Sequence, residues 1–195
     1  MANQNSARQK ATSQPRRKMS SANRTIYALL ALALFGVFFS IFIQHLPGRP
    51  NPIIEKQPDV AMPAANAGVT VEQQQITAGI ENNRIIVPLN VLLEKKFIAF
   101  DYQASNITIP LLASINNDGK LVTCIRMCEP CNSKTFRIEG TELTCGNCET
   151  HWKLGNLEGT QGSCQKYPLL PVPSSVVGNN IQIDVNDVRN WKMRI

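Results

Sequence analysis

Residues 128–148 read CEPCNSKTFRIEGTELTCGNC, a stretch that contains two C-x2-C pairs. Each pair encloses a turn-forming residue, Pro130 in the first and Gly146 in the second. A tight turn brings the two sulfurs of a pair close together and points both toward one ion. Residues 132–144 predict a hairpin that returns the second pair to face the first. The four cysteines expected to surround a common centre are Cys128, Cys131, Cys145 and Cys148.

Four thiolates are soft ligands that suit a tetrahedral zinc site, an iron site or an iron-sulfur cluster. The pattern therefore predicts a bound iron-sulfur cluster, or alternatively zinc or iron, because softness alone does not separate these. Disulfides are the competing interpretation, since six cysteines allow three bridges in an oxidising location. Covalent attachment of a c-type haem is disfavoured because Cys148 is followed by Glu149 and not by histidine.

Three side chains near the two pairs have open roles. Cys164 lies in a loop that could fold over the site, as a fifth cofactor-binding ligand, a substitute ligand or a disulfide partner of Cys124. Cys124 lies on a predicted strand and is expected to be a buried, small apolar side chain. His151 is expected either to support a metal ligand or to be a polar residue beside Trp152.

Residues 72–195 predict a mainly β domain. The expected strands are short and rich in β-branched residues, and they cover residues 85–89, 97–102, 107–115, 121–127, 143–145 and 181–185. Turn signals that favour hairpins over helices occur at residues 116–119, 139–140 and 178–180. No amphipathic helix is expected in this part. Such a small domain buries a modest core, so a metal or disulfide would add stability.

The N-terminal part predicts a membrane anchor. Residues 25–46 contain no charged residue, and a helix of this length spans about 30 Å, enough to cross a bilayer. A cleaved signal peptide is the alternative, but its apolar region is normally shorter. Residues 1–24 carry basic and no acidic side chains, so we expect a disordered arm in the cytoplasm. Residues 47–71 are proline-rich and predict a spacer.

This organisation places residues 72–195 outside the cytoplasmic (inner) membrane, on a single-pass protein. The net charge of +6 comes from the N-terminal arm, and the rest of the chain is balanced. A basic arm that runs directly into an apolar segment indicates a membrane surface as partner, and no nucleic acid is expected. Asp101 and Tyr102 have no catalytic pairing, and the sequence contains no set of nucleophile, base and orienting group. We assign no catalytic residue, and expect an electron-transfer or binding subunit more than a stand-alone enzyme.

Several of these motifs together resemble the membrane iron-sulfur (FtrD-like) domain family, over about residues 80–172. They are residues 85–89, residues 97–102, the two C-x2-C pairs, and Gly162-Ser163-Cys164 through Pro168-Leu169. The resemblance implies an iron-sulfur centre with the four paired cysteines as ligands and Cys164 as an auxiliary cysteine. It also implies electron transfer or metal handling beside a ferrous-iron transport system, with an integral-membrane partner such as an iron permease or an oxidoreductase.

A more distant likeness is to Rieske domains, through residues 118–120, residues 152–154 and a closing hairpin at residues 176–185. Cys131 and Cys148 stand where Rieske domains have histidines, and the first loop is one residue longer. The likeness implies a small antiparallel Rieske-like β domain with rubredoxin-type knuckles, tethered to one N-terminal transmembrane helix. Thiolates in place of imidazoles imply a potential below the Rieske range of about −150 to +300 mV.

Two functions fit this reading. The first is a membrane-anchored redox subunit that passes electrons to or from a membrane partner. The second is a zinc- or disulfide-stabilised extracytoplasmic interaction module without redox activity. A thiol-disulfide oxidoreductase fits less well, because no thioredoxin-like βαβ context surrounds either C-x2-C pair.

Overall fold

The structure is a computed structural model that describes residues 21–44, 49–62, 69–104 and 107–195. It divides into two units, Met1–Leu46 and Pro47–Ile195, and each is considered by itself. Most of the predicted basic arm, residues 1–24, lies outside the described residues.

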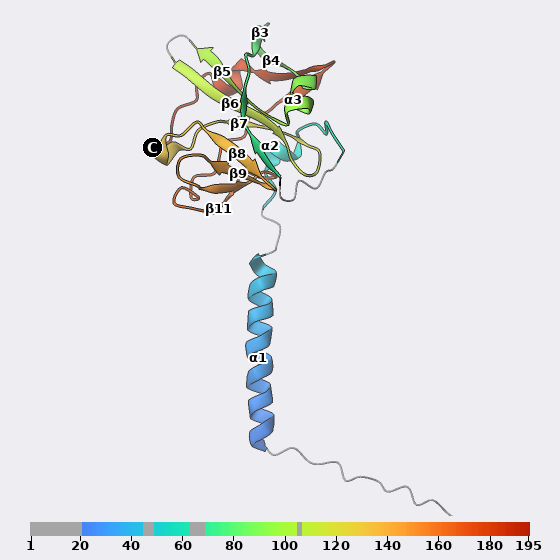
Figure 1. Cartoon of the computed structure of the whole chain (residues 1–195), viewed down its shortest axis with the longest axis vertical. Helices are drawn as coiled ribbons and strands as arrows, with labels where there is room; N and C mark the ends of the chain where they lie inside the picture. Colours follow the sequence, from blue (N-terminus) through green and yellow to red (C-terminus); the bar gives the residue numbers. More distant parts are fainter. Residues whose placement is uncertain (1–20, 45–48, 63–68, 105–106) are drawn as a thin grey trace, which may run out of the picture. The chain divides into compact units, whose positions relative to one another are not determined.

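The first unit contains one helix, α1 (Ser21–Gln44), among its described residues (Figure 1). This helix overlaps the range 25–46 that the sequence predicts as an anchor. Phe35 and Phe39 stack one turn apart, with ring centroids separated by 6.0 Å. In the part of the chain that the structure describes, no helix meets the length and apolar character needed to cross a membrane.

The second unit is mainly β and contains three sheets. The first has the order β1 (Thr70–Glu72), β8 (Phe136–Glu139), β9 (Glu142–Cys145), β10 (His151–Lys153), β11 (Gly159–Gln161). The second has the order β12 (Ser175–Val177), β13 (Asn180–Asp184), β4 (Arg84–Pro88), β3 (Gly79–Glu81). The third has the order β2 (Gln74–Gln75), β5 (Phe97–Ala104), β6 (Ile107–Ile115), β7 (Leu121–Ile125). All named pairings are antiparallel except the short pair of β2 with β5.

The predicted mainly antiparallel β fold is confirmed. Each of the six predicted strands is present, and β6 occupies the predicted range 107–115. The turn signals also lie between paired strands, because Glu139 pairs with Glu142 and Val177 pairs with Asn180. Gly140 and Gly178 take left-handed backbone angles in these two turns, with φ of 61° and 59°. Local turn chemistry therefore sets the register of both hairpins.

After residue 72 the described residues form two short α-helices that the sequence analysis did not predict, and neither is an amphipathic helix of the kind it excluded. They are α3 (Leu89–Lys95) and α4 (Val185–Val188). Each is too short to repeat a helical apolar pattern, and each is held by burial of a few side chains, Leu92 in α3 and Val185 and Val188 in α4. Tertiary packing rather than amphipathic periodicity forms these turns.

Part of the range predicted as a spacer packs against the domain. Residues 47–71 include the short helix α2 (Pro52–Glu55), which is capped by the Asn51 side chain. Ile54 is 1% exposed, and the buried Gln57 side chain donates to Thr123 Oγ1 on β7 at 3.2 Å and to the Val172 carbonyl at 2.8 Å. The folded unit thus begins well before residue 72, and the extended character of a proline-rich segment does not hold for residues 51–57.

The core of the second unit consists of two groups of buried side chains. One lies around β4, β5, β6 and β13. The other packs Phe136 against Trp152, with ring centroids 6.0 Å apart, and includes buried cysteines from the two C-x2-C pairs. Figure 1 shows β8, β9 and β11 gathered at one end of this unit, with β3 and β4 at the other. The cysteine pairs therefore lie at the edge of the second core group.

Candidate metal centre

The first C-x2-C turn is formed where the chain leaves β7. A short 3-10 helix, η1 (Glu129–Cys131), begins directly after Cys128 and contains the predicted turn residue Pro130. Asn132 ends this helix in a left-handed conformation with φ of 55°. The backbone N–H of Cys128 donates to the Ser133 carbonyl at 2.9 Å and closes the loop. The turn thus presents Cys128 and Cys131 on a backbone that is hydrogen-bonded at both ends.

The second C-x2-C turn begins at the last residue of β9. The backbone N–H of Cys145 donates to the Thr150 carbonyl at 2.9 Å, so the loop closes on itself as the first one does. The N–H of Gly146 donates to the Thr135 carbonyl at 2.8 Å and ties this loop to the first. A Cβ at Gly146 would lie 3.1 Å from Thr135 Cγ2, so the absence of a side chain allows the close approach of the two loops.

The hairpin of β8 and β9 brings the two turns face to face, as the sequence predicts. The sulfurs of Cys128 and Cys148 are 3.8 Å apart, and those of Cys131 and Cys145 are 3.6 Å apart. All four sulfurs lie within 4.8 Å of one another. Ligand sulfurs at a tetrahedral ion are about 3.8 Å apart when each metal–sulfur bond is about 2.3 Å. The four side chains therefore form a group that fits a metal ion.

The four sulfurs differ in exposure. Cys128 and Cys145 are 1% and 0% exposed and belong to the apolar core, whereas Cys131 and Cys148 are half-buried. All six cysteines are free thiols in the structure, so none is paired in a disulfide. One side of the group therefore lies against the core and the other faces the surface.

Burial and hydrogen bonds act in opposite directions on these thiols. Burial raises the pKa of Cys128, where a hydrogen bond from the Cys131 backbone acts against it. Burial also acts to raise the pKa of Cys148, but hydrogen bonds from the Thr150 side chain and backbone outweigh it and lower this pKa. The backbone of Ser133 makes a corresponding contact to Cys131. The two loops thus supply donors that stabilise thiolates in a buried setting.

Comparison with known proteins agrees with this geometry. The model of the family described as "Membrane iron-sulfur containing protein FtrD-like" matches residues 92–195, more than half of the chain. The chain belongs to this family. The FtrD-like resemblance seen in the sequence is confirmed, and the family together with the four close cysteines indicates binding of a metal or an iron-sulfur centre.

The other two comparisons add little to this assignment. No curated protein matches the chain. Among solved structures, the chain is similar to a Sphingomonas yanoikuyae B1 ferredoxin, with 20% sequence identity and a TM-score of 0.36. The match covers 43% of this chain and 79% of that chain.

Three further residues of this FtrD-like chain that the sequence analysis singled out, Cys164, Cys124 and His151, lie outside the group of four cysteines. Cys164 is buried with its sulfur 3.6 Å from that of Cys148, but it is not one of the four mutually close cysteines. Cys124 is fully buried on β7, as expected, and burial raises its pKa. His151 lies 3.1 Å from Glu142 and 3.2 Å from Thr144, so its described partners are polar side chains rather than cysteines.

Two arginines that sequence analysis did not single out hold the first loop. Arg126 is buried and donates to the Lys134 carbonyl at 2.8 Å and to Asp101 at 2.7 Å, which gives Asp101 a structural partner. Arg194, near the C-terminal end, donates through Nε to the carboxylate of Glu129, inside the first C-x2-C pair. The Glu129 side chain is 2% exposed, so its charge depends on this partner. Arg126 and Asp101 are 25 residues apart, and Arg194 and Glu129 are 65 apart. No local sequence pattern therefore predicts either contact.

Arg194→Ala is expected to destabilise the second unit by roughly 3 kcal/mol, the lower end of the range for breaking a buried pair. The reason is that the buried Glu129 carboxylate loses its cation, while Arg194 itself is partly exposed. The midpoint of urea unfolding of the full chain measures the effect. Arg84→Ala, which removes the partly exposed pair with Asp184, is the matched control and should cost below about 1 kcal/mol. Equal effects of the two substitutions would contradict the role given to Arg194.

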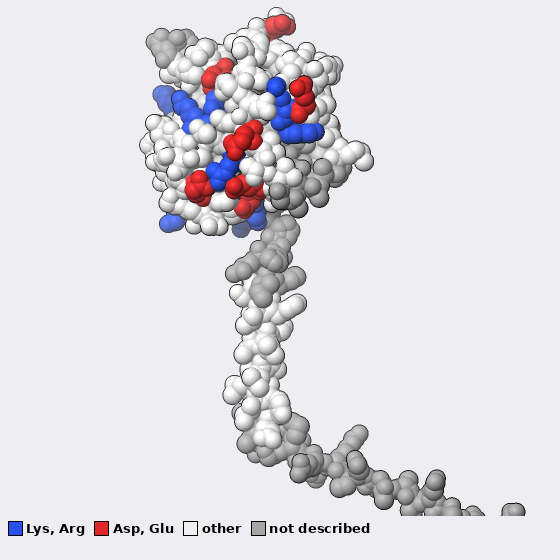
Figure 2. Space-filling view, in the orientation of Figure 1, with Lys and Arg blue, Asp and Glu red and all other residues white. Residues whose placement is uncertain are grey.

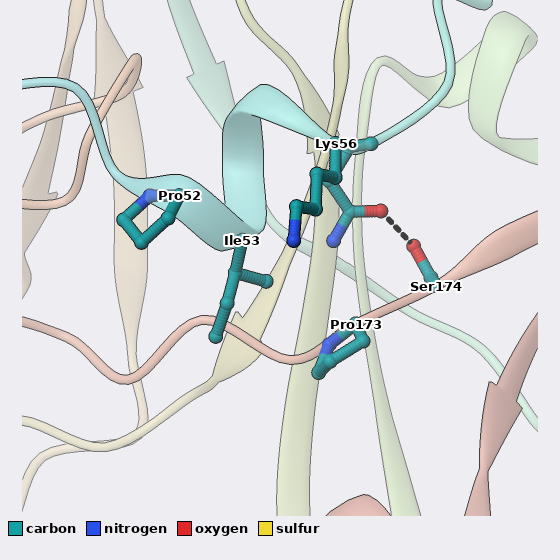
Figure 3. A pocket seen from close by; sticks show the side chains of 6 residues that line it. Pro52, Ile53, Lys56, Pro173 and Ser174 are labelled. Carbon is teal, nitrogen blue, oxygen red and sulfur yellow. Dashed lines mark hydrogen bonds between the residues drawn. The ribbon is translucent and has the colours of Figure 1, made fainter.

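A separate pocket of ≈ 380 Å³ lies beside α2 (Figure 3). Its lining residues are Pro52, Ile53, Lys56, Gln57, Pro173 and Ser174. Figure 3 shows Ser174 hydrogen-bonded to a neighbouring side chain, which is Gln57. Lys56 is the one charged residue in this lining, so the pocket carries no group of ligands or paired acids. The cysteine group is therefore the better candidate for the functional site.

Proposed function

We propose that this chain is an electron-transfer protein in which Cys128, Cys131, Cys145 and Cys148 hold a redox-active iron centre. The observation that carries the proposal is the mutual approach of the four sulfurs within 4.8 Å on two hydrogen-bonded turns, in a chain of an iron-sulfur family. Bound iron would supply a one-electron couple. The chain itself supplies the four ligands, a core that excludes water from Cys128 and Cys145, and half-buried sulfurs at Cys131 and Cys148.

The spacing of the sulfurs supports a single iron over a cluster of several irons. Contacts of 3.6 and 3.8 Å match the edges of one tetrahedral site. In a two-iron cluster, thiolates on different irons lie further apart, because sulfide bridges separate the metals. A single iron with four cysteine sulfurs is itself an iron-sulfur centre in the broad sense, so the proposal agrees with the family's description.

We also propose that the centre works at a membrane. Support comes from the family's description as membrane proteins and from the uncharged residues 25–46, which follow a basic arm. In this arrangement the β unit lies outside the cytoplasmic membrane and exchanges electrons with an integral-membrane partner, such as the permease or oxidoreductase of a ferrous-iron transport system. Figure 2 shows acidic and basic side chains interleaved on the visible face of this unit.

Metal content and voltammetry of the full chain test the electron-transfer proposal. The detergent-solubilised chain is purified without oxygen, and its iron, zinc and acid-labile sulfide are measured together with its visible absorption. We expect one iron per chain, little labile sulfide and a reversible one-electron couple on an electrode. Stoichiometric labile sulfide would replace the single iron by a cluster. Colourless protein with one zinc and no couple would reject the redox function in favour of a zinc-stabilised interaction module, since zinc fits the same four sulfurs.

A further inference from the structure

Cys148 is the point at which a third loop meets the candidate metal centre. Its sulfur lies 3.2 Å from Thr150 Oγ1 and 3.6 Å from the sulfur of Cys164, which follows β11. Cys164 also interacts with Cys128. Because Cys164 stands outside the group of four sulfurs within 4.8 Å of one another, a fifth position on the same ion does not describe its place.

The direction of the hydrogen bonds follows from the chemistry of the atoms involved. The backbone N–H of Cys164 donates to Thr150 Oγ1 at 3.1 Å, so this oxygen already accepts a bond and keeps its own proton to donate. A metal-bound Cys148 is a thiolate and can only accept. While Cys148 carries its proton, it is the donor to Thr150 Oγ1 and to the Cys164 sulfur. Metal binding removes that proton, so the Thr150 hydroxyl and the Cys164 thiol then become the donors to this one sulfur. With Cys148 as a thiolate, Cys164 N–H, Thr150 O–H and the Cys148 sulfur form a relay of two hydrogen bonds.

The third loop is packed tightly enough to keep this geometry. Thr150 is 0% exposed and Cys164 is 4% exposed. Gly162 has φ of +100°, and a Cβ added there would lie 2.6 Å from both Cα and Oγ1 of Thr150. Backbone contact between Gly162 and Thr150 thus fixes the loop that carries Cys164. The packing of this loop holds the Cys164 thiol in a fixed position beside the Cys148 sulfur.

We infer that Cys164 is not a metal ligand but a hydrogen-bond donor, and that with Thr150 it raises the reduction potential of the centre through Cys148. This inference rests on the proposed function for its redox part. Reduction adds negative charge to the metal-thiolate group, and hydrogen bonds to a ligand sulfur stabilise that charge. Both residues are positioning residues, since they act on the centre through the ligand Cys148.

The test compares Cys164→Ala, Cys164→Ser and Cys124→Ala in the full chain. Cys164→Ala should keep the wild-type metal content and lower the midpoint potential by about 59 mV, a tenfold change for a one-electron couple. Cys164→Ser retains an O–H donor and should stay closer to wild type than the alanine variant. Cys124→Ala removes a buried thiol outside the cysteine group and should leave the potential unchanged.

A second readout does not depend on a native redox couple. In chain loaded with Co²⁺, the thiolate-to-cobalt charge-transfer bands should move to lower energy in Cys164→Ala, because a thiolate with fewer donors is more easily oxidised. Thr150→Ser keeps the hydroxyl and should preserve the wild-type bands. The same bands in wild type and Cys164→Ala would overturn the donor role, and loss of metal in both Cys164 variants would make Cys164 a ligand. Absence of a couple in the wild-type chain would instead reject the electron-transfer function, while the cobalt bands still decide the role of Cys164.

Discussion

Cys131→Ser is expected to lower the metal affinity of this chain by more than about 100-fold, because it replaces one of four soft thiolates by a hydroxyl. Changes to groups that only support a ligand already cost about 10–100-fold in metal affinity, so loss of a ligand should exceed this range. Cys131 is the suitable position because it is half-buried, so the substitution does not disturb the apolar core as one at Cys145 would. Metal content after purification and competition with a chelator measure the loss.

Cys124→Ala is the matched control for Cys131→Ser. Cys124 is a fully buried free thiol on β7 and is not among the four mutually close sulfurs. Its removal leaves a small cavity and should cost about 1 kcal/mol of stability with full metal content. A Cys131→Ser chain that retained the wild-type metal affinity would contradict the assignment of the four ligands, whatever its stability.

Gly162→Ala is expected to destabilise the second unit by more than about 3 kcal/mol. A left-handed backbone angle costs a residue with a Cβ about 1–2 kcal/mol, and at Gly162 the added atom would also lie 2.6 Å from the Thr150 backbone. Thr150 cannot move away from the added Cβ, because it is fully buried beside Cys148. The urea midpoint of the metal-loaded chain and its metal content should both fall.

Gly178→Ala separates the two contributions to this effect. Gly178 also has a left-handed angle, with φ of +59°, but no atom lies within 4 Å of a Cβ built there. Strain alone should therefore cost about 1 kcal/mol and leave metal binding intact. If the two alanine variants lost equal stability, the close contact of Gly162 with Thr150 would have no part in holding the third loop.

Local sequence patterns were enough to predict most of the β structure. The range 107–115 was predicted as a strand from its β-branched residues, and β6 covers the same range. Glycines in the turns at Gly140 and Gly178 set two hairpin registers, since their backbone angles are accessible without strain. The helix α3 escaped prediction because a single buried side chain, Leu92, anchors a segment of seven residues.

The features of the site that the sequence did not predict depend on contacts between residues far apart in the chain. The spacing within each C-x2-C pair and the hairpin between the pairs depend on residues close together in the chain. The sequence could therefore predict that Cys128 and Cys131 face Cys145 and Cys148. The position of Cys164 was left open among three roles, because a loop's path depends on what it packs against. The buried pair of Glu129 with Arg194 joins residues 65 apart and was missed.

The amino-acid sequence by itself determined that two cysteine turns face each other on a β hairpin, because bond geometry and turn residues act over a few positions. Only the tertiary structure decided that Cys164 approaches Cys148 without joining the four sulfurs, and that Arg194 covers the charge inside the first turn. Both depend on burial and on backbone packing between segments distant in the chain. Such contacts form only when segments distant in the chain pack together and bury one partner of each contact, Cys164 and Glu129.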